Sequence, residues 1–382
     1  MINKKVLRVV HVVSDMHRGG AETMIMNLYR NIDRDKLQFD FICHYHKNDL
    51  EGMKKRPDYA DEIELLGGRI FRISSLGSSN SLEYVNNVRS VLRREGPFEA
   101  IHVHTNKQSG FSLLGAKLAG VKKRIVHSHT ASWDTYSKPY MNILKFMIKM
   151  TANKYCACGT KAAESAFGIM DNMKGEVKIL SNAIDSKQFL NINYDEIVNL
   201  EKELKIDNNI KIIGHVGRLD IEKNHKFILD LAKYMSDNNK EFLILLVGTG
   251  PLEMEIRETI RKLNLDKYVK LLGVRSDINI LMNMFDVFLL PSLFEGLPLV
   301  TVEAQAAGTP CIVSDAVTSE VDMGLGLVTQ LPIEKNSFKE WENAIFNNGS
   351  IQKDKNKILN KLTLKGYDVS QNVSKLYELY EI

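Results

Sequence analysis

The sequence has few of the features that mark disordered, disulfide-bonded or membrane-spanning chains. Only eight prolines and four cysteines occur among its 382 residues. No low-complexity run is present, which argues against a long disordered segment. No window approaches the ~20 apolar residues that a membrane-spanning helix needs. What remains, 44% apolar and 26% charged residues, is the balance of a globular protein whose length fits two domains rather than one core.

The cysteines and the first residues indicate a reducing compartment. Cys156-Ala-Cys158 has neither the spacing of a redox pair nor that of half a zinc site, so we expect buried free thiols. Arg8 and His11 interrupt the apolar run that follows Met1, and no small-residue cleavage site comes after it. These features do not predict a signal peptide. We therefore expect a cytoplasmic protein, at most peripheral at the inner face of the plasma membrane.

Charge is distributed unevenly along the chain. Residues 1–185 hold 28 of the 51 Lys and Arg residues and 19 of the 47 Asp and Glu residues, a net +9, and the remainder carries −5. A basic half predicts an anionic partner such as a phosphate-bearing acceptor or a membrane surface. Nucleic acid is not expected, because no nucleic-acid motif accompanies the charge. The segment 140–155 fits either an amphipathic helix on an anionic membrane or a helix packed on a sheet with snorkelling lysines.

Strand and helix patterns alternate twice along the chain. The first series ends near residue 185, and the second begins after the polar stretch 191–209. Such alternation predicts an α/β protein with two Rossmann-like, doubly wound parallel-sheet domains facing across a cleft. We expect an acceptor-binding domain over 1–185 and a nucleotide-sugar-binding domain over 186–360. We expect 361–382 to form a helix that packs back on the first domain.

Two glutamates flank a predicted helix start in the second half. Glu295 precedes the helix and Glu303 lies inside it, while Pro298 fits the first helical position. The amides of Gly296 and Leu297 would then point out of the helix start, towards an acceptor oxygen. Two carboxylates at this spacing suit the hydroxyls of one elongated ligand. A solvated helix cap with an unrelated surface glutamate explains the spacing equally well.

A cationic loop and a glycine turn also follow strands of the second half. Gly217 permits a tight turn, and Arg218 and Lys223 supply a fork and a point charge that suit a diphosphate. Two surface cations in a loop are the alternative. Gly248-Thr-Gly250 predicts a tight turn only, because the Lys-Ser/Thr of a phosphate-binding P-loop is missing.

These motifs together resemble the retaining glycosyltransferase family 4, which has the GT-B fold and includes bacterial exopolysaccharide and capsule enzymes. The resemblance covers nearly the whole chain in the right order. It is carried by Glu295-Gly-Leu-Pro-Leu-Val-Thr-Val-Glu303, Gly217-Arg-Leu-Asp-Ile-Glu-Lys-Asn224, Leu245-Leu-Val-Gly-Thr-Gly-Pro251, Gly273-Val-Arg275, Gly19-Gly-Ala-Glu22, His102-Val-His104 and His127-Ser-His129. One departure is Asn182-Ala183, where the family usually has Asn-Gly.

The resemblance implies a retaining transferase that needs no metal or cofactor. Its donor would be a nucleotide diphosphate sugar, with a UDP-sugar expected, and its acceptor a saccharide or a lipid-diphosphate-linked saccharide in surface polysaccharide biosynthesis. Matched positions imply these roles: Arg218, Lys223 and Gly217 at the diphosphate, Glu295 with Gly296 and Leu297 at the sugar, Glu303 at the ribose, the backbone of Val274 and Arg275 at the base, Gly20 near the diphosphate, and His129 as the active-site histidine with His127 in reserve.

Metal ligands and other functions are weaker interpretations of the same residues. Asp33-Arg-Asp35 follows a helix and predicts a turn. His102 and His104 lack an evident third ligand, so no metal is expected. A nucleotide-sugar epimerase and a catalytically idle nucleotide-sugar-binding subunit are the alternative functions.

Overall fold

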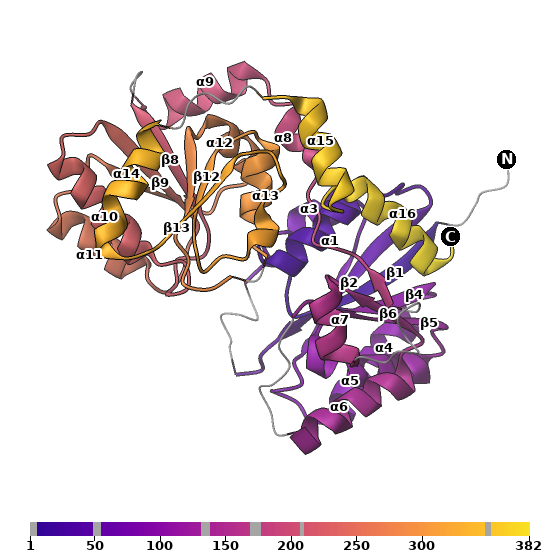
Figure 1. The fold of residues 1–382 in the computed structure, drawn as a ribbon. Coiled ribbons are helices and arrows are strands. Elements are labelled where there is room, and N and C mark those ends of the chain that lie inside the picture. The colour runs from indigo at the N-terminus through magenta and orange to yellow at the C-terminus, as the bar shows by residue number, and fades with distance from the viewer. Residues whose placement is uncertain are drawn as a thin grey trace. The chain divides into compact units, whose positions relative to one another are not determined.

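The computed structural model describes residues 6–48, 55–130, 138–168, 177–206, 210–295, 297–347 and 353–382. The chain divides into two compact units, which the ribbon in Figure 1 shows with their labelled elements. Unit 1 comprises Met1–Ala183 together with Val369–Ile382, and unit 2 comprises Ile184–Asp368.

Unit 1 is built on a seven-stranded parallel sheet in the order β3-β2-β1-β4-β5-β6-β7. Its strands are β1 (Leu7–Val13), β2 (Leu37–Tyr45), β3 (Ile70–Ser74), β4 (Ala100–Val103), β5 (Lys123–Ser128), β6 (Lys154–Ala157) and β7 (Val177–Ile179). The strand order reverses between β1 and β4, so the ends of these two strands form the switch point where ligands of such sheets bind.

Helices cover both faces of the unit 1 sheet. They are α1 (Gly20–Asn31), α3 (Ala60–Leu65), α4 (Ser81–Glu95), α5 (Ser109–Ala119), α6 (Lys138–Thr151), α7 (Thr160–Phe167) and α16 (Val369–Tyr380), with the 3-10 turn η1 (Asn106–Gln108). Buried side chains of α1, α3 and α16 pack with one face of the sheet, and those of α4 to α7 pack with the other. Strands covered on both sides are mostly apolar: the last five residues of β1 are all buried, and His11 is the one polar side chain among them.

Unit 2 repeats this plan with a six-stranded parallel sheet in the order β10-β9-β8-β11-β12-β13. Its strands are β8 (Lys211–Val216), β9 (Phe242–Val247), β10 (Val269–Gly273), β11 (Val287–Leu290), β12 (Cys311–Ser314) and β13 (Val328–Leu331). Its helices are α8 (Ser186–Leu190), α9 (Tyr194–Glu203), α10 (His225–Asp237), α11 (Glu253–Lys262), α12 (Ile278–Met284), α13 (Leu299–Ala306), α14 (Phe338–Asn347) and α15 (Lys355–Leu364), with 3-10 turns η2 (Ser319–Val321) and η3 (Lys335–Ser337). The fold class expected from the sequence, two doubly wound parallel-sheet domains, is confirmed.

The polar stretch 191–209 contains a helix that the sequence reasoning missed. Helix α9 begins with a capping box, in which the Asn193 side chain accepts from the first turn and the Glu196 side chain bonds back to the Asn193 amide at 3.0 Å. A capping box satisfies two backbone donors that a helix start leaves unpaired. Residues 207–209 of this stretch lie outside the described residues.

The carboxyl-terminal segment does not form a single helix. The chain turns after α15, and α16 begins at Val369. Helix α15 contributes Ile358 and Leu362 to a core of unit 2, whereas α16 contributes Leu376 and Tyr380 to a core of unit 1. In Figure 1 the yellow α16 lies with the indigo and violet elements of unit 1.

Two expectations about compartment meet direct observations. Cys43, Cys156 and Cys311 are buried, Cys158 is partly buried, and all four thiols are free. Among the described residues, none of the helices combines the length and the apolar character needed to cross a membrane.

Candidate functional site

Two loops at the switch point of unit 2 form the first half of the candidate site. They follow β8 and β11, which are neighbouring parallel strands, so both loops emerge at the same edge of the sheet. The Leu293 amide donates to the Glu222 carbonyl oxygen at 2.8 Å, and the Asn224 side chain donates to the Pro291 carbonyl oxygen at 3.1 Å. Each loop therefore holds the other in place.

Lys223 and Glu295 form an ion pair across these loops. Their side chains are only 17% and 13% exposed. The Ser292 hydroxyl donates to Glu295 Oε1 at 2.9 Å, and Ser292 itself is fully buried. The structure thus brings together two of the predicted site residues and fixes the carboxylate with a serine. The sequence reasoning missed that serine, although it directly follows Pro291 at the end of β11.

Arg218 differs from Lys223 in having its charge open to water. The side chain is exposed, and no hydrogen bond or ion pair joins its guanidinium to another residue in the part of the chain that the structure describes. A planar guanidinium with free donors binds phosphate oxygens in pairs. Arg218 is therefore the cation of this loop that is available to an anionic ligand.

The glycine turn after β9 packs with its backbone directly against the backbone of the cationic loop. A Cβ on Gly248, whose φ is +132°, would lie 2.0 Å from the Gly217 carbonyl oxygen, and a Cβ on Gly250 would lie 2.4 Å from the Leu219 carbonyl oxygen. The Leu219 amide also donates to the Thr249 carbonyl oxygen at 3.0 Å. Only glycine permits such a close approach of two backbones. The turn is thus the base on which the Arg218 loop rests.

Glu303 lies in α13 with its carboxyl group in apolar surroundings. Burial raises the pKa of Glu303 to about 7, and its carboxyl group has no hydrogen-bond partner among the described residues. Hydroxyl donors from a ligand would favour the ionised form. Glu303 is therefore suited to accept hydrogen bonds from the hydroxyl groups of a ligand.

The start of α13 differs slightly from the prediction. The helix begins at Leu299, and Pro298 is its N-cap rather than its first helical residue. The Leu297 amide therefore lies two residues before the first helical residue instead of one. Gly296, the other amide predicted to face the ligand, lies outside the described residues.

The loop after β10 exposes backbone near the predicted base-binding positions. Val274 is 51% exposed. The Arg275 guanidinium bonds to both oxygens of Asp277 at 2.8 and 2.6 Å and to Glu203 at 2.7 Å, which raises the pKa of Arg275. Because that guanidinium is fully engaged, Arg275 has only its backbone to offer to a ligand, as the resemblance implied.

At the switch point of unit 1, Gly20 begins helix α1. A Cβ on Gly20 would meet nothing within 4 Å, so space lies beside this backbone. Helix starts carry unpaired amides that attract anions. These features are compatible with the diphosphate role implied for Gly20.

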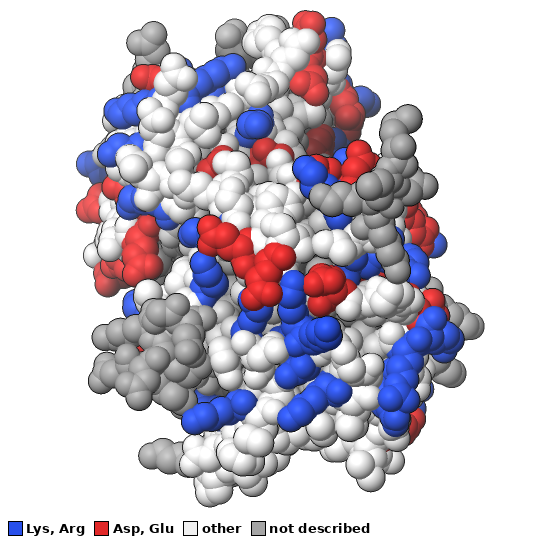
Figure 2. Space-filling model, turned by 90° about the vertical axis from the view of Figure 1, so that its right-hand side faces the viewer, with Lys and Arg blue, Asp and Glu red and all other residues white. Residues whose placement is uncertain are grey.

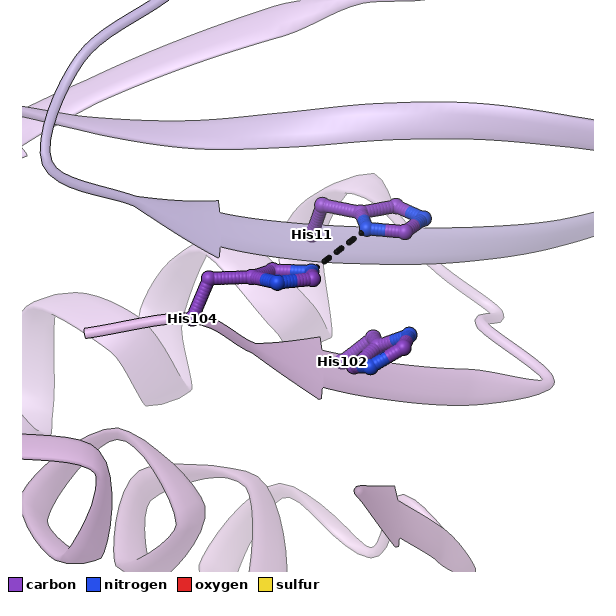
Figure 3. Close-up of side chains that lie close together, drawn as sticks. All are labelled: His11, His102 and His104. Carbon is purple, nitrogen blue, oxygen red and sulfur yellow. Dashed lines mark hydrogen bonds between the residues drawn. The ribbon is translucent and has the colours of Figure 1, made fainter. Parts of the chain in front are cut away.

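Five histidines form a buried column in the middle of unit 1. His11 lies on β1, His102 on β4 and His127 on β5, while His104 and His129 follow the ends of β4 and β5. His11 Nδ1 and His104 Nε2 are 3.0 Å apart, and Figure 3 shows these two rings facing one another beside His102. His104 Nδ1 and His129 Nε2 are 2.8 Å apart.

Burial keeps this histidine column neutral. It lowers the pKa of His11 to about 3 and that of His129 to about 4, and it also depresses the pKa of the other three rings. His127 is fully buried and neither of its ring nitrogens has a partner among the described residues, so it lies deeper than His129. Only His129 of the column is partly exposed at the strand ends.

The spacing of the column also suits a metal ion. The ligand atoms of three groups lie within 4.8 Å of one another: His11 with His102 and His104, His102 with His127 and Cys156, and His104 with His127 and His129. The sequence argument against metal, that a third ligand was lacking, is therefore wrong. Nitrogens of His11, His104 and His129 are nevertheless already used in hydrogen bonds between the rings.

Family models match both halves of the chain. Residues 18–188 match the model described as Glycosyltransferase Family 4, and residues 197–362 match the model described as Glycosyl transferases group 1. Each match spans one of the two doubly wound halves.

Full-length relatives and a solved structure extend these matches. Glycosyltransferase EpsF of Bacillus subtilis is 43% identical, over 100% of this chain and 98% of its own. An Escherichia coli protein named UDP-Gal:alpha-D-GlcNAc-diphosphoundecaprenol alpha-1,3-galactosyltransferase is 27% identical, over 98% of this chain and 96% of its own. The crystal structure of Anabaena HepE in complex with UDP and glucose superposes with a TM-score of 0.71 at 20% identity, covering 98% of this chain and 99% of that one.

Proposed function

This chain is a glycosyltransferase of the group 1 and family 4 type, with the GT-B fold, and from that premise we propose its donor and acceptor. The donor is a nucleoside diphosphate sugar, with UDP as the nucleotide. The acceptor is a saccharide or a lipid-diphosphate-linked saccharide of a surface polysaccharide. The proposal draws on the relative that is named for a UDP-galactose donor and a diphosphoundecaprenol-linked acceptor.

The observation that carries the proposal is the arrangement of charges at the switch point of unit 2. Lys223 is held on Glu295, while Arg218 on the same loop is free of partners within the described chain. Both cations of this loop can contact a diphosphate leaving group and balance its negative charge. Fixed donors at a developing anion typically contribute ~2.7–4 kcal/mol each to the transition state.

We assign the remaining roles in the order of the donor molecule. Glu295, fixed by Ser292, accepts hydrogen bonds from sugar hydroxyls, with the Leu297 amide beside it. Glu303 accepts from the ribose hydroxyls, and the backbone at Val274 contacts the base. The leaving diphosphate departs against Arg218 and Lys223, and the sugar is transferred with retention of its anomeric configuration.

The residues of unit 1 complete the proposal. His129 contacts the donor sugar through the ring nitrogen that His104 leaves free, which is Nδ1. Gly20 gives the diphosphate access to the start of α1. His127 takes no direct part, because it lies under His129 with their ring centroids 4.0 Å apart.

Helix α6 offers a surface for a lipid-linked acceptor at an anionic membrane. Tyr140, Ile143, Phe146 and Met150 are between 44% and 62% exposed, and Lys149 is exposed beside them. On the face drawn in Figure 2, Lys and Arg side chains stand in several groups with Asp and Glu side chains among them, so charge alone does not mark one membrane patch there. Apolar insertion by α6 is therefore the contact we propose.

Incubation with uridine, guanosine and adenosine diphosphate sugars tests the donor. Slow hydrolysis, followed by mass spectrometry without acceptor, should occur with a UDP-sugar, and UDP should raise the melting temperature. Release of UDP should accelerate when a lipid-diphosphate-linked saccharide is added. Conversion of the donor into its epimer would instead identify an epimerase, and stabilisation by UDP without any turnover would identify a binding subunit.

A further inference from the structure

A continuous hydrogen-bonded chain links the candidate active-site histidine to the last helix. It runs from His129 through His104 to His11 by the two bonds described above. His11 Nε2 lies 3.5 Å from the Tyr380 hydroxyl, and that hydroxyl lies 2.8 Å from His102 Nδ1. Tyr380, on α16, is fully buried and so joins two histidines of the column from across the core.

Neutral imidazoles make such a chain directional. Each neutral ring has one N–H donor and one bare nitrogen acceptor, and a hydroxyl donates once. A bond between two neutral rings therefore needs a donor nitrogen on one side and a bare nitrogen on the other. Once the proton is placed on one ring, the placement on every other ring of the chain follows.

Only two proton arrangements satisfy the whole chain. If Tyr380 donates to His102, it accepts from His11, and His129 is left with a bare Nδ1 that can act as a base. If Tyr380 donates to His11, it accepts from His102, and His129 then carries its proton on Nδ1 and can donate. The Nδ1 atom of His129 is buried and has no partner among the described residues, so a ligand oxygen that reaches it and can only accept, such as a phosphate oxygen, would select the second arrangement.

We propose that Tyr380, acting through His11 and His104, is a positioning residue that sets which ring nitrogen of His129 carries the proton, because its hydroxyl lies closer to His102 Nδ1 (2.8 Å) than to His11 Nε2 (3.5 Å) and therefore favours the first arrangement. The inference rests on the proposed function only for its effect on turnover. The coupling itself follows from the hydrogen bonds and from burial, which keeps the rings neutral. In a serine-protease triad, holding a histidine in the wrong tautomer lowers kcat by about 10⁴, which shows how strongly tautomer choice can act.

Tyr380→Phe tests the proposal because it keeps the ring in the core and deletes only the hydroxyl. We expect kcat to fall about tenfold through the mixed tautomers of His129, with KM for the donor little changed, a smaller loss than in the triad because the hydroxyl acts at a distance. Long-range nitrogen NMR of ¹⁵N-histidine-labelled protein, assigned with a His129 variant, should show His129 shifting from one tautomer towards a mixture.

Tyr84→Phe is the matched control. Tyr84 is equally buried, and its hydroxyl also lies 2.8 Å from a histidine ring nitrogen, that of His44. It packs with the opposite face of the sheet and has no link to the column. This variant should lose stability as Tyr380→Phe does while leaving the His129 spectrum unchanged.

A double variant tests whether the signal travels through the chain. In a His104→Ala background, which cuts the chain next to His129, Tyr380→Phe should have no further effect on the His129 spectrum or on kcat. Identical His129 spectra for Tyr380→Phe and Tyr84→Phe would overturn the proposal, and so would a stoichiometric metal ion in the purified protein by elemental analysis. If no donor is turned over, the proposed function fails while the NMR comparison still decides the coupling.

Discussion

The two units share one sheet order and place opposite chemistry at its switch point. In unit 1 the strands around β1 and β4 carry neutral histidines, buried and bonded to one another. In unit 2 the loops after β8 and β11 carry an ion pair and an exposed arginine. The neutral histidines of unit 1 can fix the positions of protons without introducing charge, whereas the loops of unit 2 can bind an anion.

This difference shows what a doubly wound sheet does and does not determine. The topology places a site at the carboxyl ends of the strands, and side chains grafted there decide its chemistry. Burial adds a further rule, because desolvation disfavours the charged form of His129, whereas Lys223 and Glu295 lie mostly buried against one another as an ion pair.

Unit 1 also contains a buried carboxylate, that of Asp40, which stabilises the fold and is an exception to the contrast between a neutral unit 1 site and a charged unit 2 site. Asp40 is fully buried between Arg8 and Arg69, which bond to its two oxygens at 2.5 to 3.1 Å. Breaking a buried ion pair costs about 3–5 kcal/mol, so Asp40→Asn should destabilise unit 1 by about that much without altering donor binding. Hydrogen exchange of β1 and β2 amides measures this locally, since two domains can unfold separately.

The pH dependence of this effect has a defined sign. Burial raises the pKa of Asp40, but the hydrogen bonds from Arg8 and Arg69 outweigh it and lower the pKa overall. The contribution is therefore present above the pKa of the unfolded chain and is lost as the pH falls through the folded value. Wild type and variant should converge in acid, and Asp33→Asn should have a much smaller effect, because the pKa of Asp33 is lowered mainly by an exposed ion pair with Lys36.

Removing either of the two cations of the loop after β8 should abolish most turnover, and Arg218→Ala, which breaks no ion pair among the described residues, should do so without loss of stability. Lys223→Ala and Arg218→Ala should each lower kcat about 10²–10³-fold, because each removes a fixed charge from the leaving group. Lys226→Ala is the control, since Lys226 is an exposed lysine nearby whose ion pair, within the described part of the chain, is with Asp230 on its own helix. Normal kcat in both site variants would remove the basis of the proposed donor site.

Glu303 should make donor affinity depend on pH. Its pKa near 7 means that ionisation costs folding stability as the pH rises from about 4.5 through 7, and ribose hydroxyls would offset that cost. Affinity for the nucleotide sugar should therefore rise up to about tenfold per pH unit below 7 and level off above it. Calorimetry should find no such dependence in Glu303→Gln. A wild type with flat affinity from pH 5.5 to 8 would contradict the ribose role.

The smallest expected effect concerns the helix that the sequence did not reveal. Asn193→Ala removes the N-cap of α9 and should destabilise unit 2 by about 1 kcal/mol. Its effect on hydrogen exchange should be confined to unit 2, as that of Asp40→Asn is confined to unit 1. Protection factors measured for both variants would show whether the units unfold independently.

Much of this fold follows from periodicity that one can see in the printed sequence. Strand β9 is covered on both faces and its unbroken apolar run marks it clearly, and β1 is still recognisable although Arg8 and His11 interrupt its run. Helix α9 was hidden by the polar residues around it, although Ile197, Leu200 and Leu204 form a short apolar stripe that packs against the core of unit 2. Its capping box was the remaining signal.

The site was predictable where local motifs carry it. Lys223 and Glu295 are 72 positions apart and still meet, because their strands are neighbours in the expected sheet. The chain from His129 to Tyr380 was not predictable, since it depends on which face α16 presents to the unit 1 sheet. A helix pattern fixes a stripe but does not name the strand residue that the stripe will meet.

The return of α16 to unit 1 has a consequence for synthesis. Five residues of α16, namely Val369, Val373, Leu376, Leu379 and Tyr380, complete a core whose other buried members lie within the first 183 residues. Roughly 200 residues must be translated between the last of those members and α16, which takes about 10–40 s at 5–20 residues per second. During that interval the apolar face of unit 1 that α16 later covers is exposed to solvent while the chain is still on the ribosome. A chaperone can bind this face before α16 is made.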